Sequence, residues 1–398
     1  MTLRLARDLV RMLKRGHPWV YADALRELPR CPSGTPAILL DNKRGREVAR
    51  GYCDPLSPLA FRACSVDDGV LLDDAWAERR LERALDFRSR LFGPETTGYR
   101  VLHGEGDGVP GLVVDRYDRT AVLQVDGAGP AGFWDVGGVA EWLSARLGLD
   151  GVFHKSRERG QEGTVLCGSL PRAEGEAADD GEGTVSFVEN GLRFTTDVRR
   201  GQKTGFFLDQ RDNRHLIRQL SRGRRVLNVF GYTGGFSIAA GVGGATHVTT
   251  VDLAAPAIAA ANRHWQINSL PGECHEGVAA DAFEFLEESI RRRREWDIVI
   301  VDPPSFAPSE AAVPKAAASY RKLIAAAARL VSSGGLLAAS SCSSHIHEPE
   351  FLEICEEAVA EARQRGTLVA LTNQPPDHPY PLVLPEFRYL KFVLLRIE

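Results

Sequence analysis

The chain has 398 residues, of which 43% are hydrophobic and 26% charged, and its formal net charge is −4 at pH 7. This length predicts two or three domains, and the composition is that of a soluble globular protein. The negative net charge excludes a general attraction to nucleic acid, so any such binding must use local basic patches.

Neither a membrane span nor a disulfide framework is expected from this sequence. No apolar run approaches the roughly 20 residues that a membrane helix needs, and the segment that starts at Met1 lacks the apolar core of a signal peptide. Seven cysteines, an odd number without a C-x-x-C pair, argue against both disulfides and a zinc site. We therefore expect a cytoplasmic protein that holds no metal.

Residues 1–72 are predicted to form a small β-rich module. Strands are expected at 37–41 and 47–52, joined by a turn at 42–45, and another strand is expected at 61–64. A basic segment opens the module, and on charge alone a solvated helix face is its simpler interpretation. The residues of this segment are Arg7, Arg11, Lys14 and Arg15.

Two segments of this module resemble a known family. GHPWVYADALRELP (16–29) and GREVARGYCDPLSPLAFRA (45–63) are similar to the N-terminal PUA domain of PUA-containing 23S rRNA (cytosine-5)-methyltransferases. The PUA domain is an RNA-binding fold. The resemblance implies that the partner is RNA, namely 23S rRNA, and neither DNA nor a membrane.

Residues 73–198 are predicted to form a small α+β central domain. Helices are expected at 73–92 and 133–147, with strands within 99–125 and at 151–154. The segment GEGDGVPGL (104–112) resembles the central domain of the same family. An acidic tract at 171–183 is predicted to be a mobile loop, and Asn190-Gly191 predicts a hairpin.

The segment KTGFFLDQRDNR (203–214) lies just ahead of the last predicted domain. It resembles the family's lead-in to the cofactor domain, where this segment closes over the methionine end of the cofactor. The resemblance implies that Gln210 and Arg211 contact the cofactor. A capped helix start with an ion-pair network is the alternative interpretation.

Residues 199–398 are predicted to form a doubly wound Rossmann-like α/β sheet, and the resemblance implies that it is of the class I methyltransferase type. The stretch RVLNVFGYTGGF (225–236) predicts a buried strand, a glycine turn and a helix start, and a second strand ends on Asp252. The glycines do not fit G-x-G-x-x-G, and no Lys-Ser/Thr pair follows, so a cofactor with one nucleoside and no pyrophosphate is favoured. A turn that merely connects strand to helix is the alternative. The predicted cofactor contacts here are Asn228, Phe230, Gly231, Thr233 and Gly234.

Acidic residues follow several predicted strands of this domain. The carboxyl ends of parallel strands share one edge, where ligands bind. Asp252 is expected to hold ribose hydroxyls, Asp281 an adenine amino group and Phe283 the adenine ring, which points to S-adenosylmethionine; in the family that the chain resembles, these positions bind it. Each residue alone could instead cap a helix. Segments 368–371 and 389–397 predict a final antiparallel pair.

Two further features point to the acceptor atom. Asp302-Pro303-Pro304 predicts a rigid loop that presents the Asp302 carboxylate to a flat base. Asp302 is also among the predicted cofactor contacts. Enzymes that methylate amino nitrogens carry a similar motif, so this loop alone does not identify the acceptor atom. Cys342, in SSCSSH (340–345), resembles the family's nucleophile motif. A thiolate that adds to carbon 6 of a pyrimidine makes carbon 5 nucleophilic. A buried core thiol is the alternative.

The sequence therefore predicts a methyltransferase that modifies carbon 5 of a cytosine in 23S rRNA through a Cys342 adduct, with Asp302 on the base. Alternatives are a methyltransferase of an amino nitrogen or a small molecule, and a non-catalytic RNA-binding assembly factor. Ser305, where many relatives have a basic residue, and the acidic insertion at 174–182 depart from the family pattern. The sequence leaves open which nucleotide is the target and whether the substrate is naked RNA or an assembled particle. It also leaves open which base removes the carbon 5 proton and whether the protein is a monomer or a homodimer.

Overall fold

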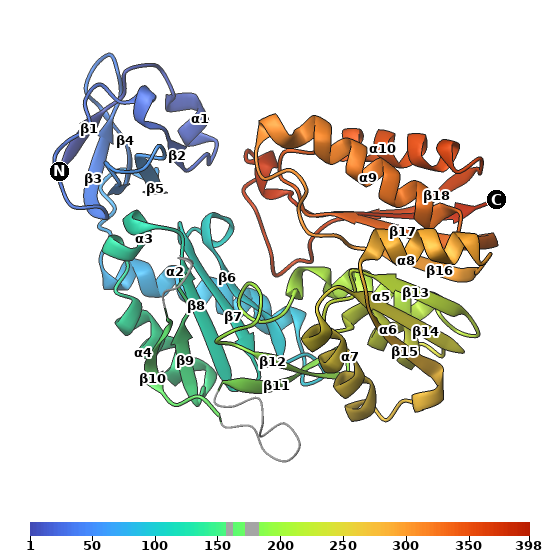
Figure 1. Ribbon diagram of the computed structural model, residues 1–398. Coiled ribbons are helices and arrows are strands. Elements are labelled where there is room, and N and C mark those ends of the chain that lie inside the picture. The colour runs from blue at the N-terminus through green and yellow to red at the C-terminus, as the bar shows by residue number, and fades with distance from the viewer. Residues whose placement is uncertain (157–161, 172–182) are drawn as a thin grey trace. The chain divides into compact units, whose positions relative to one another are not determined.

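The computed structural model describes residues 1–156, 162–171 and 183–398, and the chain divides into two compact units (Figure 1). Unit 1 comprises Met1–Glu189, Thr195–Leu208 and Pro376–Pro385, and unit 2 comprises Asn190–Phe194, Asp209–Pro375 and Glu386–Glu398. The acidic loop predicted at 171–183 lies, apart from its end residues, outside the described residues. The domain boundaries at 72 and 198 stay a prediction.

The N-terminal part of unit 1 is a five-stranded sheet with the order β1-β3-β4-β5-β2. Its elements are β1 (Thr2–Arg4), α1 (Val10–Lys14), β2 (Trp19–Val20), β3 (Thr35–Leu40), β4 (Glu47–Cys53) and β5 (Phe61–Ser65). The predicted turn joins β3 to β4 because the Asp41 carboxylate accepts hydrogen bonds from the amides of Lys43, Arg44 and Gly45. The core of this sheet includes Leu13, Leu39 and Phe61.

A second five-stranded sheet in unit 1 has the order β10-β9-β8-β7-β6. Its elements are α2 (Asp74–Leu91), β6 (Gly98–His103), β7 (Leu112–Tyr117), β8 (Thr120–Val125), α3 (Ala128–Phe133), α4 (Val136–Leu147), β9 (Gly151–His154) and β10 (Thr164–Gly168). Helix α2 begins where Asp73 accepts a hydrogen bond from the Trp76 amide. The predicted hairpin pairs β11 (Thr184–Glu189) with β12 (Leu192–Asp197), and Asn190 and Gly191 both adopt positive φ.

Unit 2 contains a seven-stranded sheet with the order β15-β14-β13-β16-β17-β19-β18. Strand β19 runs in the direction opposite to that of the other six strands. The strands are β13 (Arg225–Val229), β14 (His247–Asp252), β15 (His275–Ala279), β16 (Trp296–Val301), β17 (Val331–Ser341), β18 (Gly366–Thr372) and β19 (Lys391–Ile397). The predicted doubly wound sheet is confirmed, and so is the final antiparallel pair. The strand order reverses beside β13, which is where such sheets bind ligands.

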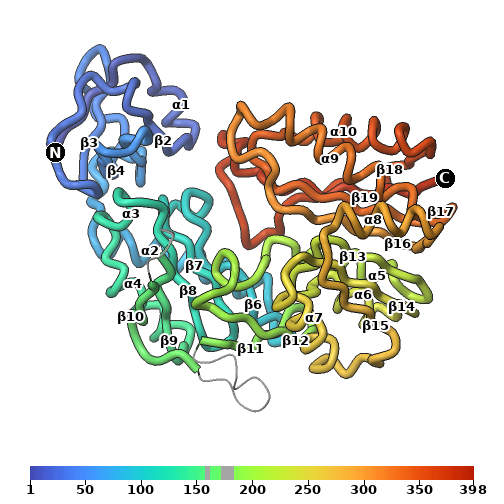
Figure 2. The backbone as a smooth tube through the Cα atoms, viewed as in Figure 1, coloured from blue at the N-terminus to red at the C-terminus, as the bar shows by residue number. Residues whose placement is uncertain are grey.

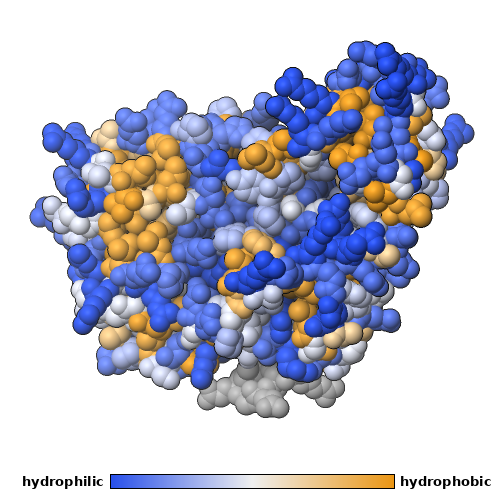
Figure 3. All heavy atoms as spheres, turned by 180° about the vertical axis from the view of Figure 1, so that it is seen from behind, coloured by the Kyte–Doolittle hydropathy of each residue, from blue (hydrophilic) through white to orange (hydrophobic). Residues whose placement is uncertain are grey.

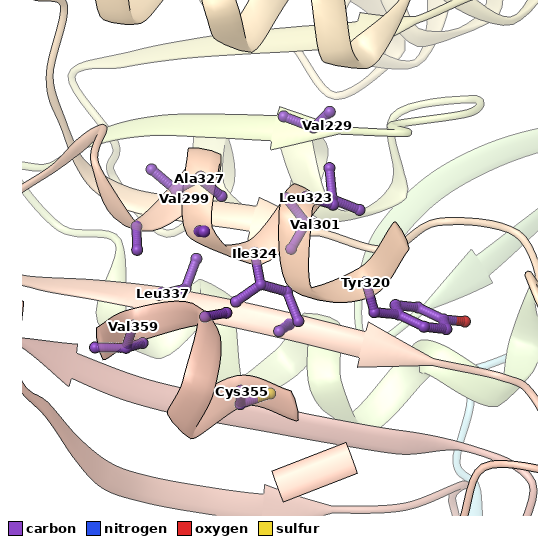
Figure 4. Close-up of a cluster of buried hydrophobic side chains, with 14 of the residues drawn as sticks. Val229, Val299, Val301, Tyr320, Leu323, Ile324, Ala327, Leu337, Cys355 and Val359 are labelled. Atoms are coloured by element: carbon purple, nitrogen blue, oxygen red, sulfur yellow. The ribbon is translucent and has the colours of Figure 1, made fainter. Parts of the chain in front are cut away.

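Helices cover both faces of this sheet (Figures 1 and 2). They are α5 (Arg211–Leu220), α6 (Gly235–Val242), α7 (Ala255–Ile267), α8 (Ala282–Arg291), α9 (Val313–Ala328) and α10 (Glu348–Glu361). Leu323 and Ile324 of α9 pack against strand residues such as Val299 and Leu337 in the main core (Figure 4). Burial on both faces explains why these strands are continuous apolar runs.

Short 3₁₀ turns complete the described elements: η1 (Ala22–Ala24), η2 (Gly104–Asp107), η4 (Leu208–Gln210), η5 (Gly272–Cys274), η6 (Glu310–Ala312) and η7 (Pro385–Phe387). Apolar side chains also reach the surface in places, as the face in Figure 3 shows. In the part of the chain that the structure describes, no helix is long and apolar enough to span a membrane.

Candidate active site

The turn after β13 is the most constrained backbone of the predicted cofactor site. Phe230 and Tyr232 adopt φ values of 60° and 46°, a left-handed conformation that costs a non-glycine residue about 1–2 kcal/mol. Between them, the Gly231 amide donates to the Val251 carbonyl over 2.9 Å. A Cβ atom on Gly231 would lie 2.5 Å from Cγ2 of Thr250, so only glycine fits this approach to β14. Such local strain is common at binding sites.

Gly234 completes the turn and caps α6. Its φ is 82°, and a Cβ atom there would lie 2.8 Å from Cβ of Ala261 on α7. Helix α6 can therefore start close to α7 only with glycine at this position.

Asp252, the last residue of β14, holds the turn in place. Its Oδ2 accepts a hydrogen bond from the Tyr232 amide at 2.8 Å, and its Oδ1 accepts one from the Ala254 amide at 2.9 Å. Because each carboxylate oxygen has a second lone pair, both can still accept hydrogen bonds from a ligand's hydroxyl groups. Asp252 thus has a structural contact, and ribose recognition by this residue stays a prediction.

Two buried polar atoms near the turn have no hydrogen-bond partner among the described residues, namely Oδ1 of Asn228 and Oγ1 of Thr233. The amide nitrogen of Asn228 donates to Oγ of Ser237 at 2.8 Å. An unpaired buried acceptor or hydroxyl costs about 1–3 kcal/mol, so such atoms call for a functional explanation. A polar cofactor at the turn would pair with them, and the residues present therefore fit S-adenosylmethionine.

Gln210 and Asp302, predicted from separate motifs, are in direct contact. The side-chain nitrogen of Gln210 donates to Oδ1 of Asp302 at 3.0 Å and to Oγ of Ser340 at 2.8 Å. Its side-chain oxygen accepts from Asn213 at 2.6 Å, and Asn213 in turn accepts from Thr372 at 2.5 Å. This buried network fixes the orientation of the Asp302 carboxylate. Direct cofactor contact by Gln210 stays a prediction.

Arg211 lies at the start of α5 and is only 2% exposed. Its Nε donates to Oδ1 of Asp212 at 3.3 Å. This ion pair agrees with the alternative interpretation of the segment, a helix start that holds charged pairs. A cofactor contact by Arg211 stays a prediction.

Asp281 is the N-cap of α8, because its Oδ1 accepts hydrogen bonds from the amides of Phe283 and Glu284 at 2.9 and 3.1 Å. The capping alternative weighed for this residue is therefore present in the structure. Phe283 is half-buried against the main core, and the Lys322 ammonium lies 5.6 Å from its ring centroid. Adenine recognition by Asp281 and Phe283 stays a prediction.

Cys342 immediately follows β17 and is partly buried. Oγ of the next residue, Ser343, lies 2.8 Å from Oγ of Ser305 in the Asp-Pro-Pro-Ser-Phe loop. The loop of Asp302 and the segment of Cys342 are thereby joined. Tyr320 of α9 lies within 3.3 Å of the hydroxyls of Ser341 and Ser343, and burial raises its pKa.

Lys391 is a residue that the sequence analysis missed. It is 2% exposed, and its ammonium donates to the carbonyls of Ser343 at 2.5 Å and Tyr389 at 2.8 Å. Burial lowers its pKa to about 8, while the charges of Cys342, Glu350 and Glu348 act in the opposite direction. A lysine directly before the apolar run 392–395 was the signal that could have identified it. Lys391 brings a positive charge next to the Cys342 segment.

The sheet, its glycine turn and its acidic strand ends define a class I methyltransferase domain. A family model for S-adenosylmethionine-dependent methyltransferases matches residues 173–396, and one for PUA-like domains matches residues 3–65. The chain belongs to the S-adenosylmethionine-dependent methyltransferase family, and S-adenosylmethionine is its cofactor.

Among curated proteins, the chain is 39% identical to a ribosomal RNA large subunit methyltransferase of Deinococcus radiodurans over 407 aligned residues, which cover 100% of this chain and 98% of that relative. It is 34% identical to ribosomal RNA large subunit methyltransferase I of Alteromonas mediterranea, with coverages of 99% and 98%. These relatives match the chain over nearly its full length.

Solved structures share the fold. A candidate methyltransferase from Streptococcus mutans has a TM-score of 0.83 at 24% identity, and each chain is covered completely. Another candidate methyltransferase, crystallised with S-adenosylhomocysteine, has a TM-score of 0.84, also at 24% identity and with complete coverage. These similarities concern the fold alone.

Proposed function

We propose that this protein methylates carbon 5 of a cytosine in 23S rRNA, with Cys342 as the covalent nucleophile. The large-subunit rRNA methyltransferases that match the whole chain, and the PUA-like model that matches its N-terminal part, support an RNA substrate. A homodimer stays one possible assembly.

The observation that carries the cysteine mechanism is the buried ammonium of Lys391 at the Cys342 segment. A nearby positive charge favours a thiolate over a thiol. Transfer to an amino nitrogen needs no thiolate, so the arrangement favours carbon 5 as the acceptor.

S-adenosylmethionine supplies an electrophilic sulfonium methyl group to this reaction. The Cys342 thiolate adds to carbon 6 of the cytosine, and the electron pair of the carbon 5–carbon 6 double bond shifts so that carbon 5 becomes nucleophilic. Asp302, held by Gln210, hydrogen-bonds the cytosine amino group or protonated nitrogen 3 and stabilises the charge that develops. After methyl transfer, carbon 5 loses its proton, the double bond re-forms and the Cys342 thiolate leaves.

The decisive experiment compares the wild-type protein with Cys342→Ala on RNA that contains 5-fluorocytosine. The wild type should form an adduct that survives a denaturing gel, because fluorine cannot leave as the proton does. Cys342→Ala should form no adduct and show no turnover, yet bind S-adenosylmethionine almost normally. Cys274→Ala, a change at a partly buried thiol in η5, is the control and should behave like the wild type. Turnover or adduct formation by Cys342→Ala would favour the amino-nitrogen alternative.

The substrate is tested by nucleoside mass spectrometry of 23S rRNA from cells with and without the gene. A 5-methylcytosine that disappears with the gene is the expected result. If an N-methylated base disappears with the gene instead, the acceptor is a base nitrogen and not carbon 5 of a cytosine.

A further inference from the structure

One edge of the unit 2 sheet lies opposite the candidate active site. Because every strand of this sheet except β19 runs in the same direction, the links that enter these strands share this edge. Hydrogen bonds at this edge join the starts of neighbouring strands: the Arg225 amide of β13 donates to Asp297 of β16 at 2.8 Å, and the Trp296 amide of β16 donates to the carbonyl of Leu330, just ahead of β17, at 2.8 Å. At about 3.3 Å per residue, a six-residue strand such as β16 separates the two edges by about 20 Å.

Arginines are concentrated in these links. The links that enter β13, β16, β17 and β18 comprise residues 221–224, 292–295, 329–330 and 362–365, and their only acidic residue is Glu295. The links that enter β14 and β15, residues 243–246 and 268–274, carry Glu273 as their one charged residue. Part of the positive charge is neutralised, since Arg291 and Arg292 pair with Glu288, Arg294 pairs with Glu276 and Arg224 pairs with Asp297. Glu398 also lies at this edge, where its amide donates to the Arg365 carbonyl.

Arg329 is exposed and donates to the Glu361 carbonyl. Five further exposed arginines of this edge form neither an ion pair nor a side-chain hydrogen bond with any residue that the structure describes. We refer to them together as the arginine edge: Arg222, Arg225, Arg293, Arg363 and Arg365. Their unneutralised charge stands out in a chain whose net charge is −4. A local surface of this kind is the route by which an acidic protein can hold a polyanion.

Two members of the arginine edge occupy positions where glycine is the usual residue. Arg293 (φ 54°) follows α8 and Arg363 (φ 59°) follows α10, each in the left-handed conformation. Their amides donate to the Ile290 and Ala360 carbonyls, as in a Schellman helix end. A charge near a helix C-terminus has a favourable dipole interaction, but an arginine here also bears a conformational cost that glycine avoids. Closing the helix therefore does not by itself call for an arginine at these positions.

We propose that the arginine edge binds the phosphate backbone of an rRNA segment other than the one that enters the candidate active site. The proposal rests on the proposed function, because it takes rRNA as the substrate. Guanidinium groups match phosphate geometry with paired donors. The links offer no exposed large apolar side chain that could anchor a protein partner, since Leu330 is 1% exposed. RNA therefore fits this edge better than an acidic protein.

Because Arg293 and Arg363 adopt a left-handed backbone conformation, both can be replaced by glycine without destabilising the fold. In the double variant Arg293→Gly/Arg363→Gly, glycine suits both left-handed positions, so the thermal midpoint should not fall. Ser269→Gly is the matched control, because Ser269 follows α7 with a φ of 56° and carries no charge. Binding of each full-length protein to a 23S rRNA transcript is measured by filter retention over a salt series, without cofactor.

The double variant should bind the transcript roughly tenfold more weakly than the wild type. Its plot of log affinity against log salt should be shallower by about 0.7–0.9 for each arginine removed. Ser269→Gly should match the wild type in both measurements.

Unchanged affinity and salt dependence in the double variant would overturn the assignment, as would an equal loss in Ser269→Gly. Because binding is measured without turnover, it is independent of the chemistry at Cys342. A wild type that binds the transcript but never methylates it would count against the proposed function and leave the arginine edge standing.

Discussion

At the scale of single residues, the candidate site depends on side chains whose charges act on their neighbours. Lys391 and Asp252 are the two clearest cases. Lys391 places a buried ammonium at the segment of Cys342, the proposed nucleophile, and Asp252 ties the turn of the predicted cofactor site to β14. Each can be tested by one substitution.

Lys391→Met should slow alkylation of Cys342 by iodoacetamide. At pH 7 the lysine is mostly protonated, because burial lowers its pKa only to about 8. Removing this charge should reduce the alkylation rate at pH 7 by roughly tenfold, which corresponds to about 1.4 kcal/mol, and should move the midpoint of the pH profile upward. Mass spectrometry of the Cys342 peptide reports the rate. Lys391→Arg keeps the charge and should restore part of the reactivity, whereas an unchanged profile in Lys391→Met would show that the lysine only supports the loop.

Asp252→Ala should weaken S-adenosylmethionine binding, because charge-assisted hydrogen bonds to the ribose hydroxyls are worth about 1.5–3 kcal/mol. Isothermal titration calorimetry should therefore show an affinity roughly 10- to 100-fold lower. Glu273→Ala removes an exposed carboxylate in η5 and serves as the control. Equal affinities for Asp252→Ala and the wild type would refute ribose recognition by this residue.

At the scale of secondary structure elements, the glycine turn sets the distance between β13, α6 and α7. Gly234 adopts a φ of 82° and faces Ala261 of α7. The turn therefore couples the stability of the sheet to the shape of the cofactor site.

Gly234→Ala should destabilise unit 2 by about 1–2 kcal/mol, the cost of a left-handed non-glycine residue, and the contact with Ala261 adds to this. Urea unfolding measures the stability, and calorimetry should show weaker cofactor binding in the same variant. Gly272→Ala is the control, because no atom lies within 4 Å of the added Cβ and φ there is not positive; its effect should stay within about 0.5 kcal/mol. A Gly234→Ala protein as stable as the control would contradict the strain argument.

At the scale of the whole molecule, buried His103 in unit 1 and partly buried His275 in unit 2 make stability depend on pH. Burial lowers the pKa of His275 to about 4 and that of His103 well below its usual value. Both rings stay neutral in the folded protein over a range in which the unfolded chain binds protons. Their contribution to stability is therefore present above about pH 6.5 and is lost as the pH falls toward the folded-state pKa.

The unfolding free energy of unit 2 should fall by up to about 1.4 kcal/mol per pH unit from His275 between pH 6.5 and 4. His275→Gln should reduce this slope by up to about 1.4 kcal/mol per pH unit, which corresponds to the uptake of one proton on unfolding. Urea titrations at several pH values measure it, and fluorescence of Trp265, which stacks on His275 at 4.5 Å, is the probe. The exposed His215→Gln should leave the slope unchanged, and a His275→Gln protein with the wild-type slope would contradict the assignment.

The amino-acid sequence by itself determined the class of this protein. Apolar runs such as 226–230 and 298–301 alternate with helical segments, and that local pattern is enough to predict a doubly wound sheet. Strand direction then places Asp252, Asp302 and Cys342 at one edge, because the carboxyl ends of parallel strands coincide. These inferences need only short-range periodicity and the direction of the chain.

The tertiary structure alone decided which side chains meet. Gln210 contacts Asp302, 92 residues away, and Lys391 reaches Ser343, 48 residues away. The second contact exists only because β19 pairs antiparallel with β17, which brings Lys391 opposite Ser341. No local pattern encodes such pairs, since hydrogen bonds between distant segments depend on the strand order and register that the whole chain adopts on folding.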